Sequence, residues 1–227
     1  MKLVFDIETV GYDFESLHES QQELLLRYVE KEKDEELRRE KKDEAIRYLN
    51  LYPFTARIVS IAMMNTETEN TLVLFEGEND KWEVKDDKIK YESHSEEKII
   101  KLFWKFIKKA DQAITFNGRM FDIPFLMLRS AILRIKPSVN LLGNRYYSTT
   151  HVDLLEQFTF HGLMRKFNLD FYCRAFGIES PKSKEITGME VNELYRAGRI
   201  KDIAIYNGKD VKATYELYKI WDEHLNF

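Results

Sequence analysis

The sequence has one cysteine, no long apolar run and no excess of positive charge, and each of these shortages excludes a class of protein. Cys173 alone cannot form an internal disulfide or a cysteine-based zinc site, which suits a reducing compartment. No run of about 18 apolar residues is present to span a membrane. Asp6 and Glu8 also interrupt the first apolar stretch, which a signal peptide would keep apolar. We therefore expect a soluble, cytoplasmic protein with no membrane partner.

The charge balance of the sequence argues against a second class of protein. The net charge of −4 provides no strongly basic field, which argues against a protein that coats duplex nucleic acid. It does not argue against an enzyme that holds only the end of a strand. Of the 227 residues, 44% are hydrophobic and 13% aromatic, enough for a sizeable core. We predict one domain over residues 1–227.

A charged segment over approximately residues 13–52 is predicted to be a helical insertion in that domain. Lys31 to Arg47 contains seven basic and seven acidic residues. Pairs four residues apart, such as Asp34 and Arg38, each support a helix by about 0.2–0.5 kcal/mol. A solvated helical projection is the favoured interpretation. The alternative is an arm that overhangs the active cleft, because the segment directly follows the first strand.

The apolar stretches elsewhere predict an α/β order. Short apolar runs predict strands at 3–9, 57–63, 70–75 and 112–116. Residues 77–92 are predicted to form a charged, irregular link with room for one short extra strand. Apolar residues at helical spacing predict helices at 96–110, 169–176, 189–197 and 200–224, with a further helix beginning near Pro124.

Two acids stand two positions apart in the first strand. Side chains at i and i+2 share one face of a strand, so Asp6 and Glu8 should lie side by side. At ~4 Å and an effective dielectric of ~20, two such charges repel by roughly 4 kcal/mol. A divalent cation such as magnesium would offset that repulsion. The alternative is a solvated strand end, because the same spacing recurs at Asp13/Glu15 and Asp34/Glu36.

Two further regions supply candidate partners for this pair. Asp122 follows the strand at 112–116, where open α/β sheets bind ligands, although an acid there also suits a helix N-terminus. Tyr206 and Asp210 share one face of the last helix. Tyr218 and Asp222 repeat that spacing twelve residues later, about 120° around the helix, so both pairs cannot face one site.

Together these residues form a chemically coherent set. Two divalent ions about 3.5–4 Å apart can clamp the attacking and leaving oxygens of a phosphoryl displacement. Their four positive charges would balance the carboxylates of Asp6, Glu8, Asp122 and Asp210. A phenol with a pKa near ~10 is a poor base, so Tyr206 is expected to orient the attacking water instead.

Three motifs carry a resemblance to a known family. FDIET at 5–9, NGRMFDIPFL at 117–126 and YNGKDVKATYELY at 206–218 resemble the motifs of DEDD-type 3′→5′ exonucleases with tyrosine in the third motif. The similarity is strongest to the proofreading domain of family-B DNA polymerases and to stand-alone predicted exonucleases. It covers residues 1–10, 55–76 and 96–218. The sister subgroup has histidine where this sequence has Ile205.

The resemblance implies both a fold and a site. The fold would be α/β and ribonuclease H-like, with a mixed five-stranded sheet of order 3-2-1-4-5 and helices on both faces. Two Mg²⁺ or Mn²⁺ ions would be held by Asp6, Glu8, Asp122 and Asp210, with Tyr206 orienting water. Asp153 is expected to support the site without being a ligand. The expected contacts with the terminal nucleotides are Thr9, Asn117, Phe121 and Lys182.

The function expected from this set is metal-dependent hydrolysis from the 3′ end of single-stranded nucleic acid, with DNA favoured. The motifs leave open a 3′→5′ exoribonuclease with the same site, because motif spacing does not encode contacts to the 2′ position. A non-catalytic module that binds strand ends is a second alternative. A phosphatase of the haloacid-dehalogenase type is a third, although that chemistry requires Asp at the place of Glu8.

Overall fold

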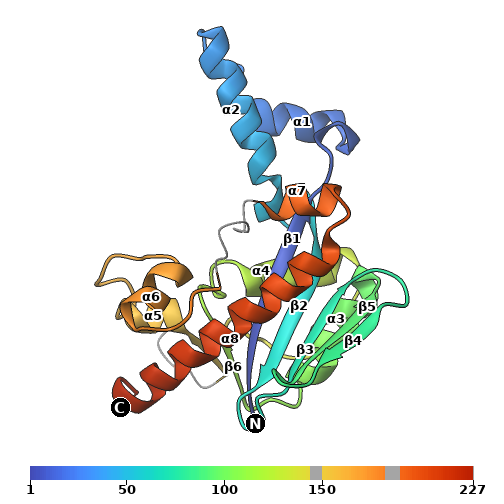
Figure 1. Ribbon diagram of the computed structural model, residues 1–227. Helices are drawn as coiled ribbons and strands as arrows, with labels where there is room; N and C mark the ends of the chain where they lie inside the picture. Colours follow the sequence, from blue (N-terminus) through green and yellow to red (C-terminus); the bar gives the residue numbers. More distant parts are fainter. Residues whose placement is uncertain (144–149, 182–189, 227) are drawn as a thin grey trace.

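The computed structural model describes residues 1–143, 150–181 and 190–226, which form a twisted mixed sheet covered by helices on both faces (Figure 1). The seven strands are β1 (Lys2–Gly11), β2 (Ala56–Asn65), β3 (Thr71–Glu76), β4 (Lys81–Val84), β5 (Ile89–His94), β6 (Gln112–Thr115) and β7 (His151–Asp153). The α-helices are α1 (Glu19–Leu26), α2 (Glu35–Arg47), α3 (Glu96–Ile107), α4 (Asp122–Ile132), α5 (Leu154–Phe158), α6 (Leu169–Ala175), α7 (Val191–Arg196) and α8 (Ile200–His224). Two short 3-10 helices, η1 (Phe14–Ser16) and η2 (Tyr48–Leu51), lie between β1 and β2.

The sheet order is β4-β5-β3-β2-β1-β6-β7. Five consecutive strands of this sheet, β3-β2-β1-β6-β7, have the predicted 3-2-1-4-5 order, with β2 antiparallel and β6 parallel to β1. The predicted number of five strands is wrong, because β5 pairs with β3 and β4 pairs with β5. Both lie largely in the segment predicted as an irregular link. β4 is mostly exposed at the sheet edge, so its sequence lacks the apolar alternation that marks a buried strand.

β1 divides its side chains between two hydrophobic layers. Leu3, Phe5 and Ile7 point into one layer, where Phe5 packs against Phe103 of α3 with ring centroids 5.0 Å apart. Val4 points into the opposite layer, which α8 covers. Because side chains alternate along a strand, Asp6 and Glu8 follow Val4 and face α8. The pleat of β1 therefore decides which helix meets the two acids.

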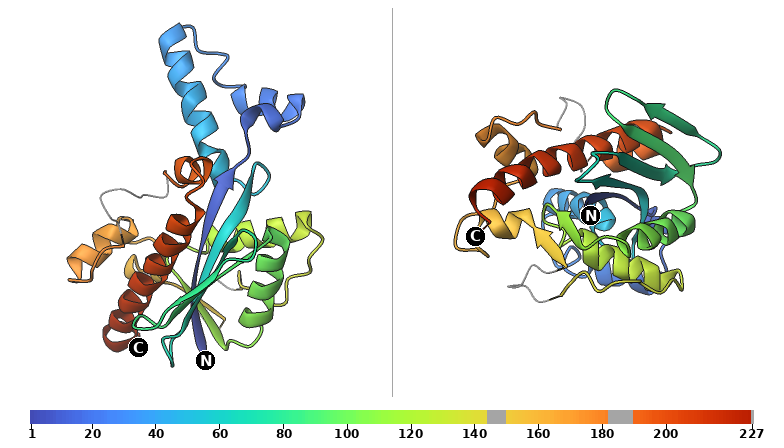
Figure 2. Two further views of the ribbon diagram at one scale, coloured as in Figure 1. Left: turned by 45° about the vertical axis from the view of Figure 1, so that its right-hand side comes forward. Right: turned by 90° about the horizontal axis from the view of Figure 1, so that it is seen from below.

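The two layers are covered by different helices. Figure 2 shows α3 and α4 on one side of the sheet and the long helix α8 crossing the other. Ile99, Ile100 and Phe103 of α3 are fully buried. α8 contributes Val211 and Leu217, which are also fully buried. Among the described residues no helix, including α8 with 25 residues, is apolar enough to cross a membrane.

The segment 13–52 projects from the end of the sheet as a helical arm, and we propose that it is an insertion in one domain. Asp34 caps α2 by accepting a hydrogen bond from the Leu37 backbone N–H at 3.0 Å. Arg38 donates to the Glu32 carbonyl at 2.6 Å instead of pairing with Asp34. Lys41 pairs with the Glu32 carboxylate at 2.6 Å. The arm therefore relies on caps and loop contacts more than on the predicted pairs.

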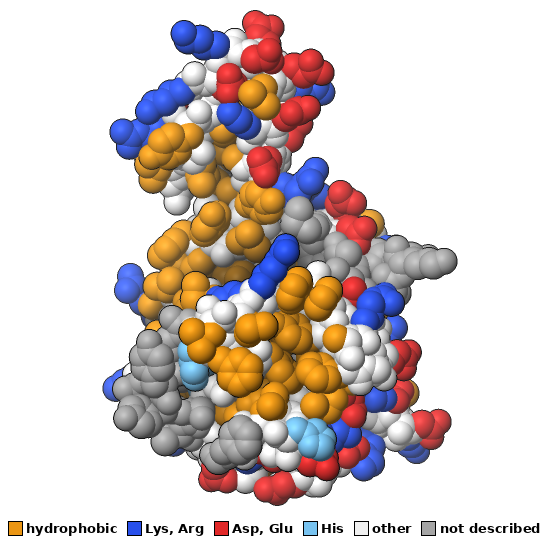
Figure 3. All heavy atoms as spheres, turned by 90° about the vertical axis from the view of Figure 1, so that its left-hand side faces the viewer, with side chains coloured by type: hydrophobic (Ala, Val, Ile, Leu, Met, Phe, Trp, Pro, Cys, Tyr) orange, Lys and Arg blue, Asp and Glu red, His pale blue; other side chains and the backbone are white. Residues whose placement is uncertain are grey.

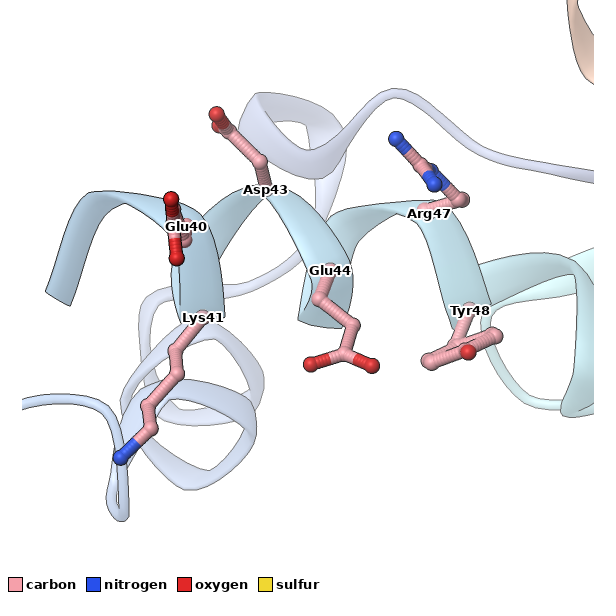
Figure 4. A pocket seen from close by; sticks show the side chains of 6 residues that line it. All are labelled: Glu40, Lys41, Asp43, Glu44, Arg47 and Tyr48. Atoms are coloured by element: carbon pink, nitrogen blue, oxygen red, sulfur yellow. The ribbon is translucent and has the colours of Figure 1, made fainter. Parts of the chain in front are cut away.

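The arm also carries a charged hollow of about 360 Å³ along α2. Figure 4 shows that its lining side chains all come from α2 and the adjoining turn. They are Glu40, Lys41, Asp43, Glu44, Arg47 and Tyr48. Because one solvated helix supplies every wall, we interpret this hollow as space between exposed side chains.

The base of the arm is joined to the sheet layers by a buried ion pair. Arg129 of α4 donates to both carboxylate oxygens of Glu96, at 2.9 and 2.7 Å. It also donates to the Pro53 carbonyl at 3.2 Å and the Tyr12 hydroxyl at 3.0 Å. Glu96 accepts from the Ile58 backbone N–H at 2.9 Å. This one guanidinium therefore ties α3 and α4 to the two residues that flank the arm, Tyr12 and Pro53.

We predict that Arg129→Met destabilises the protein by about 3 kcal/mol, because it leaves the Glu96 carboxylate buried without its partner. Urea unfolding followed by circular dichroism measures the change. The control is Arg199→Met, which removes an exposed pair with Asp202 and should cost about 0.5 kcal/mol. Equal losses in the two variants would contradict the special role of Arg129.

Candidate metal centre and active site

Three carboxylates from the two ends of the chain meet beneath α8. Asp6 and Glu8 come from β1, and Asp210 comes from α8, more than two hundred positions later than Asp6 by sequence number. One carboxylate oxygen of each lies within 4.8 Å of the others. Glu8 and Asp210 are buried, and Asp6 is partly buried. Carboxylate oxygens this close are suitable ligands for a hard divalent cation.

Asp122 lies beside this group but is not one of the three. It is the first residue of α4 and is buried, and its Oδ1 accepts a hydrogen bond from the Ile7 backbone N–H at 3.1 Å. Its charge contributes to the raised pKa of Glu8. The structure thus brings the fourth predicted acid to the edge of the cluster and anchors it to β1, between the two strand acids.

Burial and mutual repulsion both disfavour ionisation of these acids. Burial is the larger cause that raises the pKa of Glu8 well above its ordinary value, followed by the charges of Asp6, Asp210 and Asp122. Burial and the charge of Asp210 raise the pKa of Asp6 in the same way. For Asp122 the causes are burial and the charge of Asp6. A divalent cation would reverse this balance by stabilising the ionised forms.

Asp6 is held in place by a hydrogen-bonded chain that the sequence did not reveal. The Asn207 Nδ2 donates to Asp6 Oδ2 at 2.7 Å, and the Ser60 hydroxyl donates to Asn207 Oδ1 at 2.8 Å. Both Asn207 and Ser60 are fully buried. The available signal was a polar residue directly after Tyr206 in the third motif. Such partners orient metal ligands and are part of a metal site.

Tyr206 lies at the same cluster as a neutral hydroxyl. Burial raises its pKa far above the ordinary value, and the charges of Asp210, Glu8 and Asp6 raise it further. A hydrogen bond between Tyr206 and Asp210 acts in the same direction. A phenol in this environment keeps its proton at neutral pH. It can therefore donate a hydrogen bond, but it cannot act as a base.

The second tyrosine-acid pair of α8 faces elsewhere. Lys2 donates a hydrogen bond to the Tyr218 hydroxyl, and its ammonium lies 3.6 Å from the Asp222 carboxylate. These residues join the end of α8 to the start of β1. The expectation that only one of the two pairs points into the site is confirmed.

The turn that presents Asp122 is fixed by Asp153. The Asp153 carboxylate accepts hydrogen bonds from the backbone N–H groups of Asn117 and Arg119, both at 2.9 Å, and from that of Leu155 at 3.0 Å. Asn117 adopts φ +63°, and Gly118 has no space for a side chain, since a Cβ would lie 2.3 Å from Thr115 Oγ1. The expected supporting role of Asp153 is confirmed.

The predicted nucleotide contacts occupy different surroundings. Thr9 is buried, and its hydroxyl donates to the Asn50 carbonyl at 2.7 Å, at the base of the arm. Phe121 is partly buried against Phe125, with ring centroids 5.6 Å apart. Asn117 lies in the turn before Asp122. Lys182 lies outside the described residues. Contact of these four with a strand end stays a prediction.

Comparison with known proteins places this geometry in a family. Residues 48–223 match the family model of predicted 3′-5′ exonucleases related to the exonuclease domain of PolB. β1, with Asp6 and Glu8, precedes the matched range. The DNA polymerase of Pyrococcus glycovorans is 32% identical over 143 residues, 54% of this chain and 18% of that protein. DNA polymerase 1 of Sulfurisphaera ohwakuensis is 27% identical over 177 residues, 70% of this chain and 19% of that protein.

A solved structure confirms the predicted ribonuclease H-like α/β fold. The family B DNA polymerase from the hyperthermophilic archaeon Pyrobaculum calidifontis superposes with a TM-score of 0.62 at 18% sequence identity. The aligned region covers 97% of this chain and 24% of that one. At this identity the likeness concerns the fold alone.

We predict that Glu8→Gln stabilises the metal-free protein more at pH 8 than at pH 5. Because the pKa of the Glu8 carboxyl is raised in the folded chain, the folded chain binds this proton more tightly than the unfolded chain does. The free energy of unfolding therefore falls as pH rises from the unfolded pKa of about 4.3 through the raised folded pKa. Neutral glutamine removes that loss. Thermal melts in EDTA measure it, with the exposed substitution Glu83→Gln as control. A lower melting temperature for Glu8→Gln at both pH values would contradict the prediction.

Proposed function

Because the chain belongs to the family of predicted 3′-5′ exonucleases related to the exonuclease domain of PolB, we propose that it hydrolyses single-stranded nucleic acid from the 3′ end, with divalent cations. The observation that carries the proposal is the meeting of β1, α4 and α8 at one acidic cluster. The chain spans 18–19% of the polymerases named above. The comparison with these polymerases therefore concerns less than a fifth of their length.

The donor set fits hard divalent cations, since every candidate ligand is a carboxylate oxygen. We propose that Asp6, Glu8, Asp210 and Asp122 hold two ions, Mg²⁺ or Mn²⁺. When bound, such ions supply Lewis acidity and charge for an in-line displacement at phosphorus. Asn207 keeps the Asp6 carboxylate oriented toward the cluster. The hydrogen bond from Ile7 keeps Asp122 beside it.

In this reaction water attacks the last phosphodiester, and the 3′-oxygen of the preceding nucleotide leaves. Neutral Tyr206 orients the attacking water by a hydrogen bond and is not the base. We propose that the turn at Asn117 and the ring of Phe121 contact the terminal nucleotides, together with Thr9 and Lys182. Base stacking and sugar-phosphate hydrogen bonds are the contacts that such residues offer to single strands.

DNA is the favoured substrate because the curated relatives are DNA polymerases. The exoribonuclease alternative remains a second candidate, since the acidic cluster does not distinguish the two sugars. A non-catalytic end-binding module is less favoured, because the sequence keeps all four acids and Tyr206. The clustering of Asp6, Glu8 and Asp210, with Asp122 beside them, also supports the catalytic proposal. The phosphatase alternative has no support from the family match.

We predict that the purified protein releases mononucleotides from linear strands in Mg²⁺ or Mn²⁺ and that Asp210→Asn lowers the rate at least about a hundredfold. Loss of a residue that only orients a ligand already costs 10- to 100-fold. Matched 5′-labelled and 3′-labelled DNA and RNA strands report direction and sugar preference. Asp222→Asn, on the same helix, is the control that should retain activity. Internal fragments from circular single strands would refute the exonuclease proposal.

We predict that Tyr206→Phe lowers kcat by roughly tenfold to a hundredfold, as expected for a group that orients a reactant. The acidic pH limb of the rate should stay in place, since the hydroxyl does not titrate in that range. Tyr218→Phe is the matched control and should retain the wild-type rate. A Tyr206→Phe enzyme with an unchanged kcat would remove the tyrosine from the mechanism.

A further inference from the structure

A surface outside the acidic cluster exposes large apolar side chains on the segment that connects α5 with α6, on α6 itself and directly after it. We call this surface the α5–α6 face. Its side chains range from 42% exposed for Phe176 to 85% for Leu163. Figure 3 shows hydrophobic side chains gathered on the side of the molecule that carries α5 and α6. The members of the face are Phe160, Leu163, Met164, Phe171 and Phe176.

The turn that begins this face is tightly held. Phe160 and His161 both adopt left-handed backbone conformations, with φ of 49° and 58°. Such conformations are unfavourable for residues other than glycine. The cost is met by hydrogen bonds: His161 N–H donates to the Glu156 carbonyl at 2.7 Å, and Met164 N–H donates to the Thr159 carbonyl at 3.0 Å. Apolar side chains are therefore presented on a defined backbone.

The α5–α6 face is the outer side of a layer whose inner side adjoins the acidic cluster. Cys173 of α6 is fully buried, and after burial itself the charge of Asp210 is the next cause that raises its pKa, to about 11. Tyr172 packs edge-on against Phe116 at the end of β6, with centroids 5.6 Å apart. Arg119, in the turn before Asp122, forms a 3.0 Å ion pair with Glu156 of α5. The layer that carries the face therefore packs, on its inner side, against α8 and the turn before Asp122.

Cations and stacked rings accompany the apolar side chains. The Arg165 guanidinium lies 5.2 Å from the centroid of the Phe167 ring. Phe167 stacks on Phe171 with centroids 4.0 Å apart and an interplanar angle of 11°. Residues 160–176 contain three basic side chains (Arg165, Lys166 and Arg174) and one acidic side chain (Asp170), in a chain with a net charge of −4. Arg174 pairs with Asp170 at 3.0 Å, so the local excess is two positive charges, opposite in sign to a phosphodiester backbone.

We propose that the α5–α6 face binds the bases of a single strand upstream of the 3′ terminus, with the basic side chains near its phosphates. Exposed aromatic rings interleaved with arginine and lysine form the usual platform for single strands, because every base can stack on a ring. A single strand accounts for the exposed rings and the basic residues together, whereas an uncharged apolar partner would account for the rings alone. The inference rests on the proposed function, because it extends the path of the same substrate.

The test separates strand binding from hydrolysis. The variant Phe160→Ala with Phe171→Ala is compared with the native chain by fluorescence anisotropy, in EDTA, on labelled single strands of about twelve nucleotides. Stacking is worth about 1–3 kcal/mol per base, so we expect at least a tenfold rise in Kd. Hydrolysis of a dinucleotide in Mn²⁺ should be unchanged, because so short a substrate cannot reach from the cluster to the face.

Two further variants serve as a second test of the face and as a control for nonspecific binding. Leu163→Glu changes the most exposed member of the face without removing a packed ring, and it should also weaken binding several-fold. Tyr28→Ala removes an aromatic side chain of the arm that is 75% exposed and should leave Kd unchanged. Melting temperatures establish that each variant is folded.

Several results would overturn the proposal. One is a native Kd in both face variants. Another is an equal loss in Tyr28→Ala, which would indicate nonspecific binding. A third is a native dimer, seen by light scattering, that the face variants dissociate without loss of strand affinity, since the face would then bind a second copy. If the native chain cleaves no substrate, the proposed hydrolysis fails, and the anisotropy result still decides whether the face binds strands.

Discussion

The repulsion among closely packed, partly dehydrated carboxylates is the constraint on which the site depends. Asp6, Glu8 and Asp210 offer oxygens within 4.8 Å of one another, and burial together with their neighbours' charges raises the pKa of Asp6 and Glu8. Such a cluster persists only if the rest of the fold supplies more stability than the cluster removes. The two hydrophobic layers on either side of β1 supply it. The central strand is thus both the core of the sheet and the carrier of its least favourable charges.

Each acid is positioned by a different kind of contact. β1 places Asp6 and Glu8 on one face by its pleat, and Asn207 fixes the Asp6 carboxylate from α8. Asp122 is held through its own hydrogen bond from Ile7. The backbone turn before it is held by Asp153. These contacts orient the site before any cation arrives, which is the arrangement that precise metal and phosphate geometry requires.

Helix α8 shows that the place of a residue pair along a helix decides its contacts, even when the residue types and spacing are the same. α8 carries two tyrosine-acid pairs with identical spacing, yet Tyr206 and Asp210 meet the acids of β1, whereas Tyr218 and Asp222 meet Lys2. The difference follows from the rotation of about 100° per residue along a helix.

The two sides of the α5–α6 layer have different surroundings. Its inner side adjoins Asp210 through Cys173, and its outer side exposes rings and cations to solvent.

Local pattern was enough to predict the core strands, the main helices and the shared face of Asp6 and Glu8, because side-chain periodicity is a property of neighbouring residues. It was not enough for β4, which is mostly exposed at the sheet edge, or for β5, which pairs with both β4 and β3. For both strands, pairing depends on the neighbouring strand. Nor did it identify Asn207 and Ser60, which become partners of Asp6 only after α8 packs on β1 and β2. The sequence by itself determined which residues carry charge and which face of each element they share. Tertiary packing alone decided which faces meet, because contacts between distant segments depend on the order and direction of whole strands and helices.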